Sequence, residues 1–209
     1  MSNLKGVGVA LVTPFNEDLS VDFDSLTRLV EYNIENGTNY LVVLGTTAEA
    51  ATLSAAEKQE VIKHVIKINN KRLPLVLGIG GNNTLEVKKQ IEEADLTDFD
   101  AVLSVSPYYN KPNQEGLYQH YKMLASTGKQ IIIYNVPGRT GQNIEASTTL
   151  RLANEFPNLF MIKEAAPNIL QYFDILRKKP ANFSLVSGDD EYTLPVTLAG
   201  GDGVISVIG

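Results

Sequence analysis

Two kinds of hydrophobic pattern alternate along the chain. Short apolar runs rich in β-branched residues are each followed, after a turn, by a longer segment with apolar residues at helical spacing. The runs recur about every 20 to 35 residues, which is the spacing of strands joined by crossover helices. Strands are predicted over residues 6–12, 40–45, 75–79, 101–105, 130–135, 160–163, 183–186 and 204–208. Helices are predicted between them, over 22–36, 54–68, 84–94, 114–124, 147–155, 168–176 and 190–199.

Several of the predicted strands are apolar at consecutive positions, as in 41–44 and 131–133. Both faces of such strands must be covered, which favours parallel strands inside a shell of helices. Eight repeats therefore predict the α/β class and a (β/α)8 TIM barrel. A doubly wound open sheet is the alternative. Its dinucleotide-binding glycine pattern is incomplete here, because Asn83 stands where the segment 78–83 would need its third glycine.

The predicted barrel has a short C-terminal end. Such barrels take about 250 residues, whereas this sequence has 209 and stops just after the eighth predicted strand. We therefore expect one barrel domain over 1–209 that is truncated there, with the eighth helix and further C-terminal helices absent from the sequence. If the chain is complete, we expect poor stability or loss of activity, because two apolar strands would be bare on one flank.

Composition narrows the functional class. The net charge is −6 and no basic run is present, so nucleic acid is not expected as a partner. The absence of cysteine excludes disulfides, thiolate metal sites and a cysteine nucleophile. No window reaches the roughly 18 to 20 apolar residues of a membrane span, and residues 1–12 do not have the features of a signal peptide. A cytoplasmic protein with no membrane partner is expected.

Polar side chains that could react follow the predicted strands, where the active sites of such barrels lie. Lys163 directly follows the apolar segment 160–162 on a strand with both faces covered. Burial there would lower the pKa of its amine and raise the nucleophilic fraction, as in Schiff-base lysines. The plainer interpretation, which we weigh about equally, is an ion pair with the adjacent Glu164 or a side chain that extends to solvent.

The other candidates are weaker when taken singly. Tyr134 and Tyr109 could exchange protons with a carbonyl or carbinolamine oxygen, or could be amphipathic residues with the hydroxyl in water. Arg139, in a Pro-Gly-Arg-Thr-Gly turn, could bind a carboxylate with two hydrogen bonds, or could be an exposed loop arginine. Thr46 and Thr47 could bind a carboxylate or relay protons, or could simply cap a short helix.

Metal and serine chemistry are disfavoured. His64 and His120 lie in predicted helices with no partner at metal-ligand spacing, so both are expected to be surface or packing residues. Neither Ser106 nor Ser187 lies in a nucleophile-elbow pattern. The pair Asp189 and Asp190 could hold a metal or act as acid and base, but is better explained as capping the next helix. No metal site is predicted.

Six segments at the strand ends together identify a family. The chain resembles the class I pyruvate-dependent aldolases of the N-acetylneuraminate lyase family and, within it, the dihydrodipicolinate synthases. The resemblance runs from about residue 6 to the last residue, in order and in register with the strand ends. The segments are GTTAE at 45–49, SPYYNKP at 106–112, YNVPGRTG at 134–141, IKEA at 162–165, SGDD at 187–190 and GVISV at 203–207.

The resemblance implies a specific reaction. Lys163 would form an imine with pyruvate, and the resulting enamine would attack the aldehyde of L-aspartate-4-semialdehyde. The product, 4-hydroxy-tetrahydrodipicolinate, leads to diaminopimelate and lysine. The resemblance implies no cofactor, metal or organic, because the lysine imine itself is the electron sink.

The resemblance also assigns catalytic roles. Tyr134 would donate and accept protons at the imine-forming carbon, and Thr46 and Tyr109 would complete a proton relay. In the family the tyrosine at the Tyr109 position reaches into the neighbouring subunit's site. A homodimer or homotetramer is therefore expected.

Substrate-binding roles follow in the same way. Thr47 would hold the pyruvate carboxylate and Arg139 the carboxyl end of the semialdehyde, while Gly188 and Ile205 would line the pyruvate pocket. Sugar-acid lyases of the family usually have Gly-Ser-Thr at 45–47 and other groups at Arg139. Two alternatives remain: an N-acetylneuraminate or 2-keto-3-deoxy-sugar-acid lyase, and a catalytically silent pyruvate-binding barrel.

Two departures from the family pattern concern the turn at 48 and feedback control. Ala48 replaces a usual glycine but leaves both threonine hydroxyls in place. Asn82, Glu86 and Tyr108 match a site where lysine inhibits many members. Ala55 and Lys58 occupy positions that are histidines in some lysine-sensitive members. The extra cation at Lys58 would repel a cationic ligand, so weak or absent lysine inhibition is expected.

Overall fold

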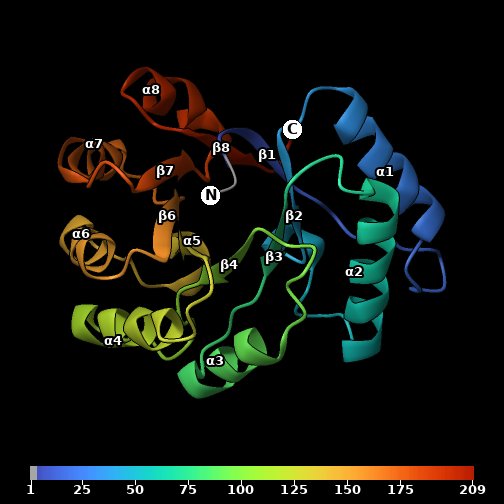
Figure 1. Cartoon of the computed structure of the whole chain (residues 1–209), viewed down its shortest axis with the longest axis horizontal. Helices are drawn as coiled ribbons and strands as arrows, with labels where there is room; N and C mark the ends of the chain where they lie inside the picture. Colours follow the sequence, from blue (N-terminus) through green and yellow to red (C-terminus); the bar gives the residue numbers. More distant parts are fainter. Residues whose placement is uncertain (1–3) are drawn as a thin grey trace.

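Eight parallel strands close into a barrel in the computed structural model, which describes residues 4–209. Residues 1–3, on which part of the signal-peptide prediction rests, lie outside the described residues. Each strand pairs with the next in sequence, and β1 also pairs with β8, so the ring is complete (Figure 1). The predicted fold class is confirmed. The strands are β1 Gly6–Ala10, β2 Tyr40–Val43, β3 Leu75–Gly78, β4 Ala101–Val105, β5 Ile131–Asn135, β6 Leu159–Glu164, β7 Ser184–Ser187 and β8 Gly203–Ser206.

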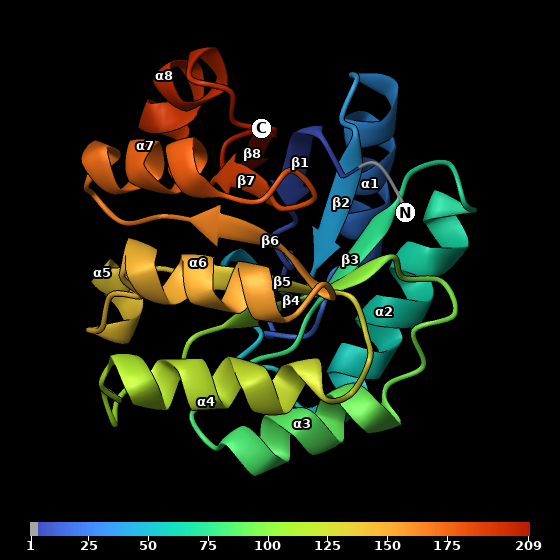
Figure 2. The ribbon, with the colours of Figure 1, turned by 60° about the vertical axis from the view of Figure 1, so that its left-hand side comes forward.

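Helices surround the strands as an outer layer, and α4, α6 and α7 lie side by side along one flank (Figure 2). The helix predicted from residue 54 begins with the expected capping box, in which Ser54 and Glu57 bond to each other's backbone N–H. The helices are α1 Phe23–Glu35, α2 Ala55–Asn69, α3 Thr84–Glu93, α4 Gln114–Ala125, α5 Pro137–Thr140, α6 Ala146–Glu155, α7 Ile169–Lys178 and α8 Thr193–Leu198.

Short helical turns are where the predicted elements differ from the structure. The one-turn helix α5 and the 3-10 turn η1 Thr46–Ala48 were not predicted, because three or four residues show no apolar periodicity. The seventh predicted helix, over 190–199, is divided into the 3-10 turn η2 Asp190–Tyr192 and α8, which precedes β8 and so is not the helix expected after the eighth strand. Several strands end one or two residues earlier than predicted. In β2 the reason is that Leu44 adopts a left-handed conformation, with φ 56°.

The hydrophobic core has an inner and an outer part. Alternate strand residues meet inside the barrel, including Leu103, Ile132, Met161 and Ile205. The residues between them point outward and pack against the helices in two further clusters. This alternation decides which polar side chains at the strand ends face the barrel interior.

The seam between β1 and β8 depends on glycine. Gly6 and Gly203 are paired across it, and Gly203 has φ 143°, which side chains rarely adopt. A Cβ at Gly203 would lie 2.0 Å from the carbonyl oxygen of Gly6. Closure of the barrel therefore requires this residue type at position 203.

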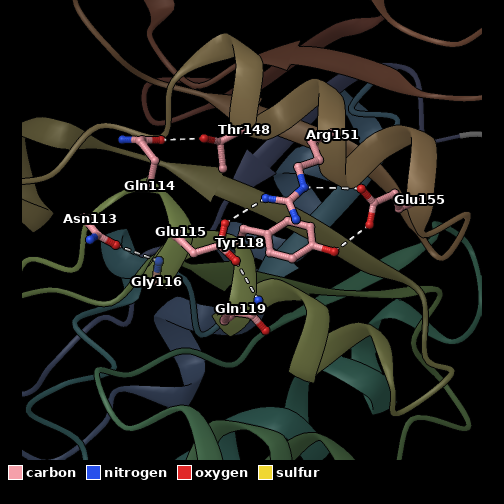
Figure 3. Close-up of polar contacts among 9 residues, drawn as sticks. All are labelled: Asn113, Gln114, Glu115, Gly116, Tyr118, Gln119, Thr148, Arg151 and Glu155. Atoms are coloured by element: carbon pink, nitrogen blue, oxygen red, sulfur yellow. Dashed lines mark hydrogen bonds and ion pairs between the residues drawn. The ribbon is translucent and has the colours of Figure 1, made fainter.

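An arginine joins α4 to α6 at the surface (Figure 3). The Arg151 guanidinium lies 3.4 Å from the centre of the Tyr118 ring and bonds Glu115 at 2.8 Å and Glu155 at 3.3 Å. The Tyr118 hydroxyl also donates to Glu155, at 2.5 Å. Stacking and charge together fix these two helices outside β5 and β6.

No helix in the described part of the chain is both long enough and apolar enough to cross a bilayer.

Candidate active site

Lys163 and Tyr134 form the centre of the candidate site. They lie at the carboxyl ends of β6 and β5, directly opposite each other in the strand register. The Lys163 Nζ lies 4.6 Å from the centre of the Tyr134 ring. Both side chains are buried, with 3% and 6% of their surface exposed. A protein amine in such a place can approach a carbonyl beside a phenol that exchanges protons.

The charge state of Lys163 is set by burial. The pKa of its amine is lowered to about 8, mainly by removal from water; the charge of Asp190 opposes this change and the charge of Arg139 adds to it. The predicted desolvation is confirmed. The ion pair with Glu164 is wrong, because the Glu164 carboxylate bonds Asn135 and Gln171 on the outer side of the barrel.

The Tyr134 phenol is held in its neutral form. Burial raises its pKa, and the polar Thr46 side chain and the charge of Arg139 partly offset that rise. A neutral phenol can donate a proton to a developing oxyanion or leaving hydroxyl. Thr46 and Arg139 are thus close enough to change the pKa of Tyr134, and Arg139 also changes that of Lys163.

Thr46 and Thr47 lie inside η1, immediately after β2. The interpretation that they cap this turn is wrong, because the N-cap position is occupied by Gly45 and no side chain caps the turn. Ala48 fits without strain: its side chain is buried, and its carbonyl accepts a 2.8 Å hydrogen bond from the Thr13 hydroxyl. The alanine therefore leaves this turn intact.

Arg139 lies in α5, which begins with Pro137 and ends at Gly141 in a left-handed conformation, φ 69°. Proline at the first position and glycine at the end are favoured there, since they fit the required backbone. The Arg139 side chain is exposed at the rim, in reach of solvent and of a ligand carboxylate.

Gly188 follows β7 and Ile205 lies on β8, so both are on the opposite side of β6 from Tyr134. A Cβ at Gly188 would stand 2.8 Å from Lys163 Cε, so a larger residue there would displace the lysine side chain. Ile205 is fully buried inside the barrel. Asp189 caps η2 as predicted, whereas Asp190 instead accepts hydrogen bonds from the Ser206 hydroxyl at 2.5 Å and the Val207 N–H at 3.2 Å.

Tyr109 is not packed against the central group in this chain. It is 89% exposed on the loop between β4 and α4, with φ 73°. Lys111 in the same loop also has a positive φ, 43°. Two non-glycine residues whose backbone is held at positive φ, a costly conformation, make the loop a specific, strained structure.

The residues matched to a lysine site lie on two neighbouring segments, the first turn of α3 with the loop before it and the loop after β4. The Asn110 side chain donates to the Asn82 carbonyl at 3.2 Å, which joins the loop of Tyr108 to the segment before α3. Glu86 accepts from Gln90 within α3 at 3.2 Å, and Tyr108 is 40% exposed. Their role in ligand binding stays a prediction.

The two histidines have packing roles, as predicted. His64 bonds the Thr27 hydroxyl at 2.7 Å, and buried His120 bonds the Thr84 hydroxyl at 2.8 Å. Burial lowers the pKa of His120 to about 4, so it is neutral at pH 7. Among residues 4–209, no three His, Cys, Asp or Glu side chains are grouped so that they could hold a metal ion.

Sequence reasoning missed a buried polar group behind the site. Asn135 and Glu164 directly follow Tyr134 and Lys163, are fully buried and face the helices. A signal was present in the sequence, because Asn135 and Glu164 are polar residues on strands that are covered on both faces. Such residues are costly to bury and need hydrogen-bond partners.

Comparison with known proteins decides the family. The model described as the Dihydrodipicolinate synthetase family matches residues 3–209. The chain belongs to this family.

Individual members agree over nearly the whole chain. The 4-hydroxy-tetrahydrodipicolinate synthase of Flavobacterium psychrophilum is 59% identical over 205 residues, covering 98% of this chain and 70% of that protein. The crystal structure of dihydrodipicolinate synthase from Thermotoga maritima is 42% identical with a TM-score of 0.95, covering 99% and 71% of the two chains.

A third relative carries a ligand. A chloride-inhibited dihydrodipicolinate synthase from Acinetobacter baumannii, solved in complex with pyruvate, is 46% identical with a TM-score of 0.93. The match covers 98% of this chain and 70% of that one. The family and fold expected from the sequence are confirmed.

Proposed function

We propose that this chain condenses pyruvate with L-aspartate-4-semialdehyde to give 4-hydroxy-tetrahydrodipicolinate, in the route to diaminopimelate and lysine. Family membership supports the lyase class, and relatives 59% and 55% identical bear the name of this synthase. The single observation that carries the chemistry is the buried Lys163 amine, 4.6 Å from the Tyr134 ring centre.

The first step makes the imine. The neutral Lys163 amine attacks C2 of pyruvate, and the carbonyl oxygen takes a proton from Tyr134. Tyr134 takes the proton that the nitrogen releases and returns it to the hydroxyl, which leaves as water and gives the iminium ion. Loss of a proton from C3 gives an enamine, whose C3 forms the new carbon–carbon bond with the aldehyde carbon of the semialdehyde. The amino group that the semialdehyde brought then attacks the imine carbon, which closes the ring and displaces the Lys163 amine.

The remaining site residues bind and exchange protons. Thr46 relays protons to and from Tyr134, an assignment supported by its influence on the pKa of that phenol. Thr47 holds the pyruvate carboxylate, and Arg139 the carboxylate of the semialdehyde. Gly188 and Ile205 line the pyruvate pocket beside Lys163. Pyruvate in the Acinetobacter relative supports this choice of first substrate.

Tyr109 gives a reason to expect association of two copies. It is largely exposed yet held in a strained backbone. We infer that it completes the proton relay in a partner subunit's site, in a homodimer or homotetramer. Sedimentation analysis of wild type and Tyr109→Phe, with activity measured on each, tests this. A fully active monomer would exclude the inference.

The proposed function is tested by trapping the imine. The chain is incubated with pyruvate and borohydride, and its intact mass and peptide map are measured. One reduced pyruvate adduct on Lys163 is expected, and none in Lys163→Met. A folded wild-type chain that forms no adduct would overturn the aldolase chemistry and leave a silent barrel.

The second substrate is tested separately. With pyruvate present, turnover is compared between L-aspartate-4-semialdehyde and hydroxylated sugar aldehydes. Faster turnover of the semialdehyde, lost in Arg139→Gln, supports the synthase. Preference for a hydroxylated aldehyde would assign the chain to the sugar-acid lyases instead.

A further inference from the structure

A buried polar network lies behind the two reacting residues, on the other face of the same strands. The register pairs Tyr134 with Lys163 and, at the next position, Asn135 with Glu164. Successive side chains on a strand point to opposite faces. Tyr134 and Lys163 therefore face the barrel interior, while Asn135 and Glu164 face the helices and are 0% exposed.

Three donors hold the Glu164 carboxylate. The Asn135 side-chain amide and the Ala166 backbone N–H donate to Oε1, each at 2.8 Å. The Gln171 amide, from α7, donates to Oε2 at 2.8 Å. A carboxylate only accepts hydrogen bonds, so this arrangement suits its ionised form. The group is fixed by a neighbouring strand, its own loop and a helix.

The same network reaches the segment that carries Arg139. Asn135 accepts from the Ile144 N–H at 2.9 Å and donates to the Asn143 side chain at 2.8 Å. The Asn143 amide in turn donates to Gln171 at 2.8 Å. Positions 143 and 144 end the segment that begins after β5 and includes Arg139. One connected set of bonds thus joins β5, β6, α7 and this segment.

The backbone next to Lys163 is fixed as well. The Glu164 carbonyl accepts hydrogen bonds from the Tyr172 hydroxyl and from the Gly188 N–H, both at 2.6 Å. Gly188 is the residue that leaves room for the lysine side chain. The Glu164 side chain and main chain therefore set the position of the strand end from which Lys163 projects.

A buried charge with only neutral partners is costly, and packing alone would be served by an apolar residue. Catalysis, by contrast, needs reacting groups held to within about 0.5 Å, which such networks provide. We propose that Glu164 and Asn135 are positioning residues that hold Lys163 and Tyr134 in the mutual geometry for imine formation, with Gln171 and Asn143 tying the Arg139 segment to the same frame. This inference rests on the proposed function.

Glu164→Gln is the variant that tests the inference. It keeps the shape of the side chain but replaces one carboxylate oxygen with an NH2 group. This group would face one of the three N–H donors that now bond to the carboxylate, so that partner has to move. We expect kcat to fall by about tenfold or more. The KM for pyruvate should change by less than about twofold, because other groups bind the pyruvate carboxylate. Trapping at saturating pyruvate should slow in parallel with kcat.

Two further variants separate positioning from stability. Gln171→Met removes the donor on α7 without touching either strand, and we expect a smaller fall in kcat in the same direction. Asn158→Ala is the matched control at the opposite end of the same strand pair. There the Asn158 amide donates to the carbonyls of Ala125 and Lys129, each at 2.9 Å. This variant should lower Tm yet keep kcat within about twofold.

The outcomes are distinct. Trapping of pyruvate on wild-type Lys163 decides the proposed function independently of the variants. With that established, a Glu164→Gln enzyme within about twofold of wild-type kcat overturns the positioning role. An equal loss of kcat in Asn158→Ala also overturns it, since the effect would then follow stability alone. If Glu164→Gln does not fold, as judged by circular dichroism, Gln171→Met decides by the same criterion.

Discussion

The Lys163 amine and the Tyr134 ring are neighbours across one strand pair, 4.6 Å apart from Nζ to ring centre. A ring face attracts the protonated amine, whereas burial favours the neutral one. Burial prevails, and the pKa of Lys163 falls to about 8. Near neutral pH a useful fraction of the amine is therefore unprotonated beside a phenol that still carries its proton.

Imine formation should depend on pH through Lys163. The rate of adduct formation with pyruvate and cyanoborohydride should rise by about tenfold per pH unit below pH 8 and level off above it, because only the neutral amine attacks. Intact-mass spectrometry at a series of pH values measures this. Lys163→Met should give no adduct, and the surface variant Lys129→Met should behave as wild type. A flat profile between pH 6 and 9 would contradict the assignment of the nucleophile.

The two charges that act on Lys163 should move this profile in opposite directions. Arg139 lowers the pKa of Lys163 and Asp190 raises it. The midpoint of trapping should therefore rise in Arg139→Gln and fall in Asp190→Asn. Each profile is measured at saturating pyruvate, and low ionic strength enlarges the shifts. Shifts of the same sign in both variants would show that the midpoint reports something other than these charges.

Gly188→Ala should slow trapping strongly without unfolding the chain. The added Cβ would lie 2.8 Å from both Lys163 Cε and Ala165 Cβ, so the lysine side chain must shift. We expect adduct formation to fall by about a hundredfold. In the matched variant Gly138→Ala the new methyl meets nothing within 4 Å, and trapping should be unchanged. Normal trapping by Gly188→Ala would show that the close contact is easily relieved.

Stability should report the protonation of Glu164. Burial raises its pKa to about 7 from 4.5, so between these values the folded chain binds more protons than the unfolded chain. The free energy of unfolding therefore decreases as pH rises through this window. His120 acts in the opposite sense, because its pKa falls to about 4 and the unfolded chain then binds more protons between 4 and 6.5.

Comparison with a variant isolates the Glu164 contribution. Glu164→Gln removes its titration and leaves that of His120, so unfolding by urea at pH 4.5 to 7 should show a more positive slope with pH than in wild type. The difference across the window should be about 2 to 3 kcal/mol. Equal slopes in the two proteins would mean that Glu164 has an ordinary pKa.

Feedback by lysine should be weak. If L-lysine binds near Asn82 and Glu86, where the family pattern places it, the positive charge of Lys58 would repel the ammonium groups of the ligand. Turnover is measured against added L-lysine, with Lys58→Ala as the comparison, in which inhibition should strengthen. Strong inhibition of the wild type below about 1 mM, an affinity of about 4 kcal/mol or better, would refute this.

The sequence was sufficient for the fold and for placing Lys163 beside Tyr134. Runs such as 131–133 could be covered only inside a helical shell, and their regular recurrence led directly to the closed barrel. Lys163 and Tyr134 could be placed together because parallel strands end at one rim. The short turns η1 and α5 were missed, since one turn of helix carries no periodic signal.

Local pattern determined the strands, their order and the residue types at the rim, because hydrophobic alternation and turn residues act over a few positions. Tertiary structure alone decided the partner of Glu164, which turned out to be Asn135 and Gln171 and not the adjacent Lys163. It also decided that Gly188 makes room for the lysine and that burial lowers the pKa of Lys163 to about 8. These properties depend on burial and on contacts between residues far apart in the chain, since desolvation and hydrogen bonding are set by what surrounds a group in space.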